Sequence, residues 1–331
     1  MDAASKTMDS LSVVVPVYNS ELILPEFLER LDLVLVSTKL QYEIILVNDA
    51  SRDRSWGMIQ ELSTRYHRVK GINLMRNYGQ HNALLCGIRA ARHEVIVTMD
   101  DDLQHPPEEI PALLTELSMQ GADVVYGRPE REQHGLWRNL ASRATKLAME
   151  QMIGATNARD ISSFRAFRTH LRDGFSSFQS PFVSIDVLLT WSTAKSTAIN
   201  VRRDPRKTGK SNYNTWKLLV ATINVIMAFS TLPLRVATML GFIMAFLGTA
   251  VLAFVLWNYL LHGSNPGFPF LACTIAIFSG AQLLALGIIG EYLGRIFLRS
   301  MGRPVYAIKD IAGSRPVAIV EKHPSNEESE S

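Results

Sequence analysis

Short apolar runs rich in β-branched residues alternate with amphipathic stretches between residues 11 and 127. Five such runs predict strands, at 11–17, 42–49, 69–74, 94–99 and 123–127. The stretches between them have the apolar spacing of helices, at 21–37, 53–66, 80–92 and 106–120. Strands that alternate with helices indicate βαβ units and a mostly parallel sheet. The pattern therefore predicts a Rossmann-like α/β fold, whose ligands bind at the carboxyl ends of the strands.

The pattern changes after residue 127. Two basic, polar loops follow, at 127–139 and 203–214, and residues 136–153 have the spacing of an amphipathic helix. Further strands are predicted at 162–168 and 197–203. The segment 214–235 then predicts an interfacial helix at the headgroup level of a membrane.

Two long segments near the C-terminal end contain no charged residue. Each exceeds the ~20 apolar residues that cross a bilayer core. They predict a transmembrane hairpin over 236–298, with spans at about 236–261 and 269–290. We expect a catalytic domain at 1–213 before it and a C-terminal segment at 299–331, with a disordered tail, after it. Gly290 and Gly294 have the GxxxG spacing that lets two membrane helices approach closely.

Positive charges flank the hairpin and are absent from its connecting loop. Arg235 precedes the first span, and four basic residues follow the second: Arg295, Arg299, Arg303 and Lys309. The positive-inside rule places both ends of the hairpin in the cytoplasm. Residues 1–10 have no apolar signal-peptide core, so the N-terminal domain is also expected to be cytoplasmic, at the inner or plasma membrane.

Composition removes several classes of protein. The 34 Lys and Arg against 31 Asp and Glu give a net charge of +3, too small to argue for nucleic acid. The two cysteines are too few for a disulfide framework or a cysteine zinc site. The turn after the first strand is not GxGxxG, and no GxxxxGK[ST] occurs, which disfavours a dinucleotide dehydrogenase and a P-loop ATPase.

Acidic residues follow two of the predicted strands. Asp100, Asp101 and Asp102 end the strand at 94–99, where repulsion among them requires a cation or hydrogen-bond donors. Asp100 and Asp102 point the same way in an extended segment and can share a divalent ion, although acids also favour the first turn of a helix. Asp49 either receives a donor from a base or ribose, or caps the helix that begins near Asp53.

Basic residues concentrate in the two loops and on the strand between them. Guanidinium groups bind phosphate through paired hydrogen bonds, while the alternative is a solvated basic face or attraction to anionic lipid. The residues concerned are Arg128, Arg131, Arg165, Arg168, Arg202, Arg203, Arg206, Lys207 and Lys210.

Eight segments in the right order together resemble the polyprenyl-phosphate sugar transferases of glycosyltransferase family 2. They are PVYN (16–19), VNDAS (47–51), RNYGQHNAL (76–84), DDDLQHPPE (100–108), SSFR (162–165), RKTGKSNY (206–213), TLPLR (231–235) and GEYLGR (290–295). The group includes bactoprenol glucosyltransferases, undecaprenyl-phosphate formamido-arabinose transferases and dolichol-phosphate mannose synthases. The resemblance implies a GT-A fold.

The resemblance also implies a role for individual residues. Those expected at the nucleotide are Pro16, Tyr18, Glu21, Asp49, Gln80 and Asp100. Asp102 and Gln104 are expected to hold Mg²⁺ or Mn²⁺. Those expected at the acceptor phosphate are Arg128, Arg131, Ser163 and Arg165, and at the donor diphosphate Arg206, Lys210 and Ser211. Catalysis falls to Asp100, Asp102 and Arg206. Relatives often carry Glu where this chain has Ser20, so it stays open whether Glu21 takes over that contact.

The implied activity is inverting transfer of one sugar from a nucleotide diphosphate sugar, with UDP favoured, to polyprenyl phosphate. The QxxRW motif of processive synthases is missing, which favours a single transfer. Asp186 lies near the place of the base in hydroxyl-using relatives, but we favour a helix-surface or interface acid there. RNYGQH leans towards the formamido-arabinose type and SNY towards the glucosyl type. The alternative is a non-catalytic, membrane-tethered nucleotide-binding regulator or scaffold; a homo-oligomer is compatible with either.

Overall fold

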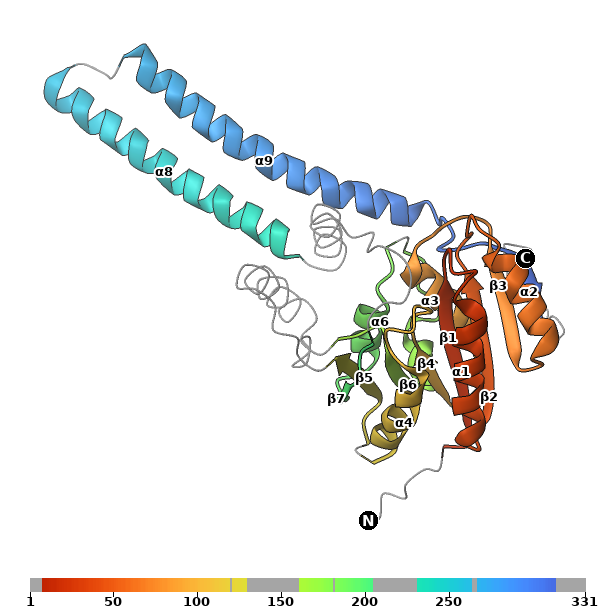
Figure 1. Cartoon of the computed structure of the whole chain (residues 1–331). Coiled ribbons are helices and arrows are strands. Elements are labelled where there is room, and N and C mark those ends of the chain that lie inside the picture. The colour runs from red at the N-terminus through yellow and green to blue at the C-terminus, as the bar shows by residue number, and fades with distance from the viewer. Residues whose placement is uncertain are drawn as a thin grey trace, which may run out of the picture.

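The computed structural model describes residues 8–119, 121–129, 161–180, 182–204, 231–263 and 267–313. Within those ranges one sheet has the strand order β7-β5-β6-β4-β1-β2-β3-β8 (Figure 1). Its strands are β1 Ser10–Val17, β2 Gln41–Asn48, β3 Val69–Leu74, β4 Val95–Thr98, β5 Val124–Pro129, β6 Arg165–Arg168, β7 Ser196–Val201 and β8 Ile308–Ala312. The helices are α1 Leu24–Ser37, α2 Ser55–Arg65, α3 Gln80–Ala90, α4 Ile110–Met119, α6 Ile185–Ser192, α8 Leu232–His262 and α9 Phe268–Ser300.

The centre of the sheet is parallel, as the alternation predicts. β1 pairs in parallel with β2 and β4, and β2 with β3. The sheet becomes mixed towards both edges, because β6 runs antiparallel to β4 and β5, and β8 antiparallel to β3. The seven strands predicted from the sequence are present, with ends shifted by a few residues at most. The predicted helix at 136–153 lies outside the described residues.

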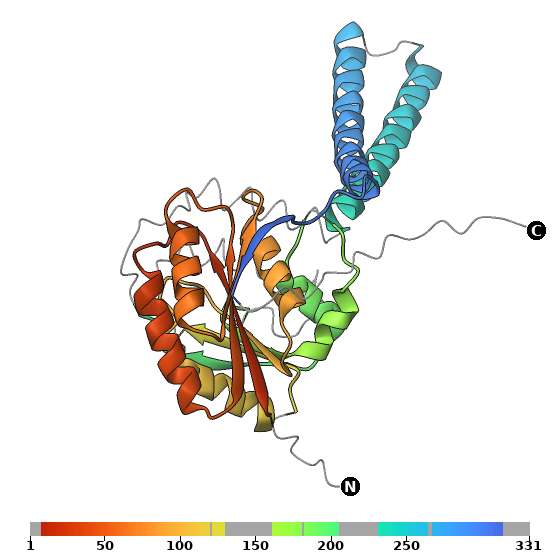
Figure 2. The same cartoon turned by 90° about the vertical axis from the view of Figure 1, so that its right-hand side faces the viewer.

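Strand β8 is the element that the sequence did not predict. It belongs to the segment 299–331, which we expected to lie outside the catalytic domain, yet it completes the edge of that domain's sheet. Figure 2 shows the chain leaving the hairpin and returning to the sheet edge. A backbone bond from Met75 N to Ala307 O (2.9 Å) fixes the return next to the end of β3.

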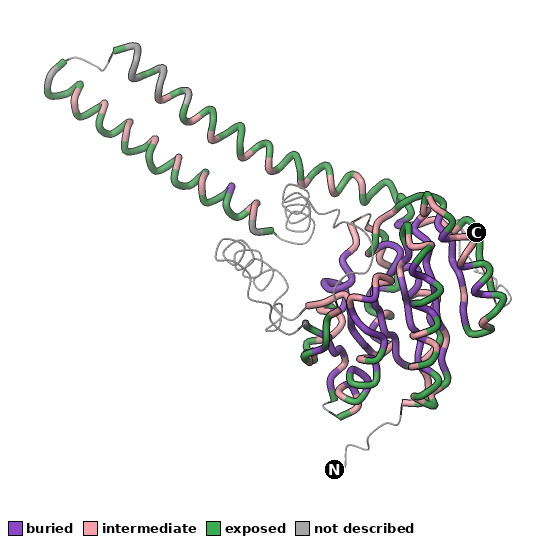
Figure 3. The backbone as a smooth tube through the Cα atoms, viewed as in Figure 1, coloured by how far each residue is buried: buried purple, intermediate pink, exposed green. Residues whose placement is uncertain are grey.

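Side chains alternate between two hydrophobic cores, one on each face of the sheet. Along β1, Val13, Val15 and Val17 join the core formed with α1, α2 and α4, whereas Val14 joins the core formed with α3 and α6. Figure 3 shows these strands as the buried centre of the domain. Since both faces are covered, the carboxyl ends of the strands are the part of the sheet left for a ligand.

Gly87 lets α3 pack closely on the sheet, and its replacement tests that packing. A Cβ at this position would overlap Cγ1 of Val14 and lie 3.1 Å from Cγ2 of Val47. We expect Gly87→Ala to lower the free energy of unfolding by about 1–3 kcal/mol, measured by thermal unfolding. Gly57→Ala in α2 is the matched control, because nothing lies within 4 Å of its added Cβ. Equal melting temperatures for the two variants would contradict this packing.

Helices α8 and α9 project from the domain as a pair (Figure 1). Their apolar segments Pro233–Leu261 and Ile277–Ser300 have mean hydropathies of 2.5 and 1.4, and 0% of either window is buried. Such exposed apolar helices fit the predicted transmembrane hairpin. A Cβ on Gly248 would lie 3.1 Å from the Phe278 ring, whereas nothing lies within 4 Å of one on Gly290 or Gly294. The close approach of the helices is therefore at Gly248 and not at the GxxxG pair.

Candidate active site at the carboxyl ends of the strands

The acidic triplet leaves the sheet directly after β4. Asp100 is held from two sides: its Oδ1 accepts from Gln80 Nε2 (2.7 Å) at the start of α3, and its Oδ2 accepts from Ser163 Oγ (2.8 Å) just before β6. Asp102 Oδ1 accepts from the backbone N–H of Gln104 (3.1 Å). These contacts orient the carboxylates of Asp100 and Asp102 at one end of the sheet. The capping alternative fails, because the next helical turn, Pro107–Glu109, has no side-chain cap.

Asp101 has different surroundings from its two neighbours, and residues 101–102 lie in a turn after β4 instead of the extended segment that we expected. Its Oδ2 is buried and has no hydrogen-bond partner among the described residues. This burial raises the pKa of the Asp101 carboxyl to about 7; the charges of Asp100 and Asp102 raise it further, and the Ser20 hydroxyl opposes both effects. Asp101 therefore holds a proton at a pH where an ordinary carboxyl is ionised.

This raised pKa predicts that stability falls as the pH rises. A group whose pKa is higher in the folded state stabilises the fold fully below its unfolded pKa, and this contribution is lost as the pH rises through its folded pKa. For Asp101 these two values are about 3.8 and about 7. We expect the melting temperature of the wild type to fall between pH 5.5 and pH 8 in a buffer with EDTA. Asp101→Asn should make this fall smaller, since an amide does not ionise. An equal fall in both proteins would contradict the assignment.

Asp49 at the end of β2 organises the loop between β3 and α3. Its two carboxylate oxygens accept from the backbone N–H groups of Tyr78 (2.7 Å) and Gly79 (2.8 Å), while burial raises its pKa. Gly79 has φ +94°, a left-handed backbone that glycine adopts without strain. Asp49 thus fixes the entry into α3, and does not cap the helix near Asp53 as one of our alternatives had it.

The loop after β1 carries the other residues expected at the nucleotide. Pro16 lies in β1, and the Tyr18 side chain that follows is 41% exposed and open to a ligand. The Glu21 carboxylate accepts from the backbone N–H of Arg54 (2.7 Å) at the start of α2, and Glu21 N donates to Asp53 Oδ2 (3.1 Å). Glu21 therefore stabilises the first turn of α2. Its contact with a nucleotide stays a prediction.

Arg165 does not lie where an acceptor phosphate could reach it. The side chain is 1% exposed, its Nε donates to Thr98 Oγ1 (3.0 Å), and its Nη1 forms an ion pair with Asp186. The expectation for Arg165 is therefore wrong, because a buried guanidinium neutralised by a carboxylate has no face left for a phosphate. Asp186, expected at a surface or interface, is the buried partner of this pair.

The remaining acceptor-site residues fall into two groups. The Ser163 hydroxyl already donates to Asp100, so it joins the acidic cluster instead. Arg128 is exposed at the end of β5, where its Nε donates to Asn200 Oδ1 (2.7 Å). Arg131 lies outside the described residues, as do the three residues expected at the diphosphate: Arg206, Lys210 and Ser211.

Gln104 binds the guanidinium of Arg203, a residue that was not among our site assignments. Its Oε1 accepts from Arg203 Nη2 (2.6 Å) and Nε (3.2 Å), and its backbone O accepts from Asp204 N (2.9 Å). The amide oxygen expected on a metal therefore faces Arg203 in this structure. Arg203 was visible as part of the second basic loop, but only the fold shows that it contacts Gln104, whose backbone N–H donates to Asp102.

The donor set fits a hard divalent ion. Among the described residues, no three His, Cys, Asp or Glu side chains converge as a metal cluster. Mg²⁺ needs fewer protein ligands, because one or two carboxylates and the phosphate oxygens of a substrate complete its shell. Asp100 and Asp102 supply such carboxylates, with the guanidinium of Arg203 nearby to bind phosphate.

Comparisons with known proteins found relatives of this sequence. Residues 12–175 match the family model described as "Glycosyl transferase family 2". The chain is 34% identical over 316 residues to the undecaprenyl-phosphate 4-deoxy-4-formamido-L-arabinose transferase of Pseudomonas aeruginosa, covering 94% of this chain and 93% of that protein. It is 33% identical over 312 residues to the transferase of the same name from Pseudomonas fluorescens, covering 93% and 92%.

A solved structure shares the fold of the catalytic domain. It is glucosyl-3-phosphoglycerate synthase from Mycobacterium tuberculosis, crystallised with Mn²⁺, UDP and glucosyl-3-phosphoglycerate, at a TM-score of 0.50 and 18% identity, covering 68% of this chain and 80% of that chain. The likeness confirms the predicted GT-A-like arrangement of the mixed sheet.

Proposed function

The chain belongs to glycosyl transferase family 2, and from this premise we propose that it moves one sugar from a nucleotide diphosphate sugar to undecaprenyl phosphate or a similar polyprenyl phosphate. The observation that carries the proposal is the pair Asp100 and Asp102, held at the carboxyl end of β4 in a domain anchored by an exposed apolar hairpin. Relatives named for transfer to undecaprenyl phosphate match nearly the whole chain, hairpin included.

On the donor side we propose a UDP-sugar. The solved neighbour was crystallised with UDP and Mn²⁺, and Pro16, Tyr18 and Asp49 of this chain lie at the carboxyl ends of β1 and β2. Asp100 and Asp102 would hold Mg²⁺ or Mn²⁺, and such an ion, when bound, neutralises charge on the departing diphosphate. Arg203 in the structure, with Arg206, Lys210 and Ser211 from the same loop, would bind the diphosphate oxygens.

On the acceptor side the chemistry needs no general base. A phosphate monoester has a second pKa of about 6, so its oxygen is already a nucleophile at neutral pH. That oxygen forms a bond to the anomeric carbon while the bond from that carbon to UDP breaks, which inverts the configuration and releases UDP. The buried carboxylate of Asp186 fits this mechanism, because Arg165 compensates its charge and the reaction requires no base from it.

The hairpin would hold the active site at the membrane that contains the lipid acceptor. A polyprenyl chain leaves the bilayer at a cost of about 0.8 kcal/mol per CH₂, so the site must come to the membrane surface. We propose two spans with both ends cytoplasmic, since Arg235 lies in the first turn of α8 and Arg299 and Arg303 stand at and after the end of α9.

A transfer assay on the full chain in detergent tests the proposal. Purified protein, Mg²⁺ or Mn²⁺ and undecaprenyl phosphate are incubated with a panel of radiolabelled UDP-sugars, starting with 4-deoxy-4-formamido-L-arabinose and glucose. We expect label from one of them in the organic-soluble lipid fraction. Nucleotide binding without lipid-linked product would favour a regulator. If the protein binds no nucleotide with Mg²⁺ and none with Mn²⁺, a scaffold is favoured.

A further inference from the structure

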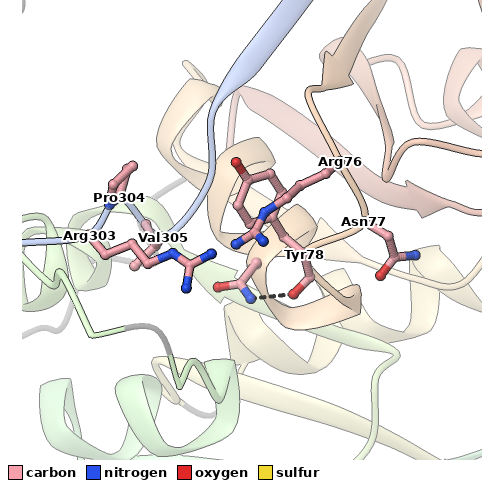
Figure 4. A pocket seen from close by; sticks show the side chains of 7 residues that line it. Arg76, Asn77, Tyr78, Arg303, Pro304 and Val305 are labelled. Carbon is pink, nitrogen blue, oxygen red and sulfur yellow. Dashed lines mark hydrogen bonds between the residues drawn. The ribbon is translucent and has the colours of Figure 1, made fainter. Parts of the chain in front are cut away.

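A cavity lies beside the loop between β3 and α3. It has a volume of about 150 Å³ and is formed by that loop, the first turn of α3 and the segment that returns from α9 (Figure 4). Its lining is Arg76, Asn77, Tyr78, Asn82, Arg303, Pro304 and Val305. None of the residues expected at the nucleotide, metal or acceptor is among them.

The cavity is positively charged without compensation. Figure 4 shows the guanidinium groups of Arg76 and Arg303 pointing towards one another across it. Arg76 stacks on the Tyr78 ring at 4.6 Å, and no carboxylate lines the cavity among the described residues. Two like charges that face each other are unfavourable unless an anion lies between them. Paired guanidinium groups are the arrangement that binds phosphate.

Asn82 adds a second requirement. The residue is 9% exposed, and its Nδ2 donates to the Tyr78 carbonyl oxygen (2.6 Å). Its Oδ1 is buried and has no partner among the described residues. A buried acceptor left unpaired is costly, so an occupant that donates a hydrogen bond is favoured. The occupant therefore combines a phosphate with a neighbouring N–H or O–H group.

The position of the cavity identifies where such a group comes from. Arg303 lies three residues after Ser300, the last residue of the apolar helix α9. In a chain whose hairpin spans a bilayer, this places the cavity at the depth of the phospholipid headgroups. Phosphodiester headgroups with a terminal amine or hydroxyl occur at that depth.

We propose that this cavity binds the headgroup of a bilayer phospholipid whose phosphate carries a hydrogen-bond donor, such as phosphatidylethanolamine or phosphatidylglycerol. Arg76 and Arg303 bind the phosphate, and Asn82 Oδ1 accepts from the amine or hydroxyl. The site is separate from sugar transfer, but it shares the loop in which Asp49 holds Tyr78 and Gly79. A bound lipid would therefore fix the domain at the membrane beside the candidate donor site.

Native mass spectrometry of the full chain in a neutral detergent tests the site. The protein is delipidated and mixed with phosphatidylethanolamine, phosphatidylglycerol or phosphatidylcholine. The phosphatidylcholine headgroup has a phosphate but no N–H or O–H donor. We expect the wild type to retain the first two lipids several-fold better than the third. Arg303→Gln and Arg76→Gln should each weaken retention by about tenfold, the loss expected for a charge-assisted hydrogen bond. Both residues are exposed, so folding is checked by an unchanged melting temperature.

Arg299→Gln is the matched control, because Arg299 is an exposed arginine on the last turn of α9 that does not line the cavity. Equal retention of the donor-bearing lipids by the Arg303→Gln variant and the wild type would overturn the site. Equal retention of phosphatidylcholine by the wild type would overturn the role of Asn82. A further arm adds inorganic phosphate alone; stabilisation of the wild type by phosphate, with no lipid retained, would assign the site to a soluble phosphate and overturn the lipid proposal.

Discussion

Asp102→Ala is expected to lower transfer of sugar to the lipid phosphate by about a thousandfold or more. The carboxylate lies at the carboxyl end of β4, one residue beyond the buried Asp101, and its Oδ1 is oriented by the N–H of Gln104. In the proposed mechanism the reaction needs stabilisation of charge on the leaving diphosphate, and no base substitutes for it. Losing one such electrostatic contact typically costs 10²–10³-fold, and losing the ion that the carboxylate holds costs more.

The measurement is the initial rate of label entering lipid at saturating UDP-sugar. Glu29→Gln is the matched control, since Glu29 is an exposed carboxylate on α1, away from the carboxyl ends of the strands, and its rate should equal that of the wild type. EDTA should suppress the wild type to the level of Asp102→Ala, and added Mg²⁺ or Mn²⁺ should restore the wild type alone. A variant within tenfold of the wild type would remove Asp102 from the catalytic machinery.

The sequence predicted the elements that are locally encoded. Alternating apolar runs between covering helices mark strands whatever their partners are, so the strand ends that position Asp49 and Asp100 were found without the structure. Strand β8 escaped because its pattern, IKDIA, is short and polar and its pairing partner β3 lies more than 230 residues earlier. An edge strand of this kind is defined by its neighbour and not by its own composition.

The side-chain partners were the part that the sequence could not supply. Ser163 and Arg165 lie in a motif that resembles an acceptor site, but only the fold brings Asp100 to the first and Asp186 to the second. Gln104 is similar, because Arg203 reaches it from a loop 99 residues later. In each case the polar group is bonded to a residue far away in the sequence, which no local pattern reveals. For Arg165, burial of the charge forces such pairing.

The pair Arg165–Asp186 is expected to give the largest stability effect of any single substitution discussed. Arg165→Ala removes the cation and leaves Asp186, which is 9% exposed, as an uncompensated buried charge. Breaking a buried ion pair in this way costs about 3–5 kcal/mol, which for a domain of this size lowers the melting temperature by about 10 °C. His81 does not replace the lost cation, because burial lowers its pKa and keeps the ring neutral.

The double variant Arg165→Met with Asp186→Leu separates a lost charge from lost packing. It removes both charges and keeps similar volume, so its melting temperature should recover most of the loss seen in Arg165→Ala. Arg52→Ala, which removes an exposed arginine, is the control and should melt like the wild type.

A chain of hydrogen bonds connects the pair to the candidate active site. Arg165 donates to Thr98, Thr98 Oγ1 donates to the Ser163 carbonyl (2.8 Å), and the Ser163 hydroxyl donates to Asp100. The double variant should therefore fold well and still transfer sugar more slowly than the wild type, through a misplaced Asp100; a full rate would show that the pair serves stability alone.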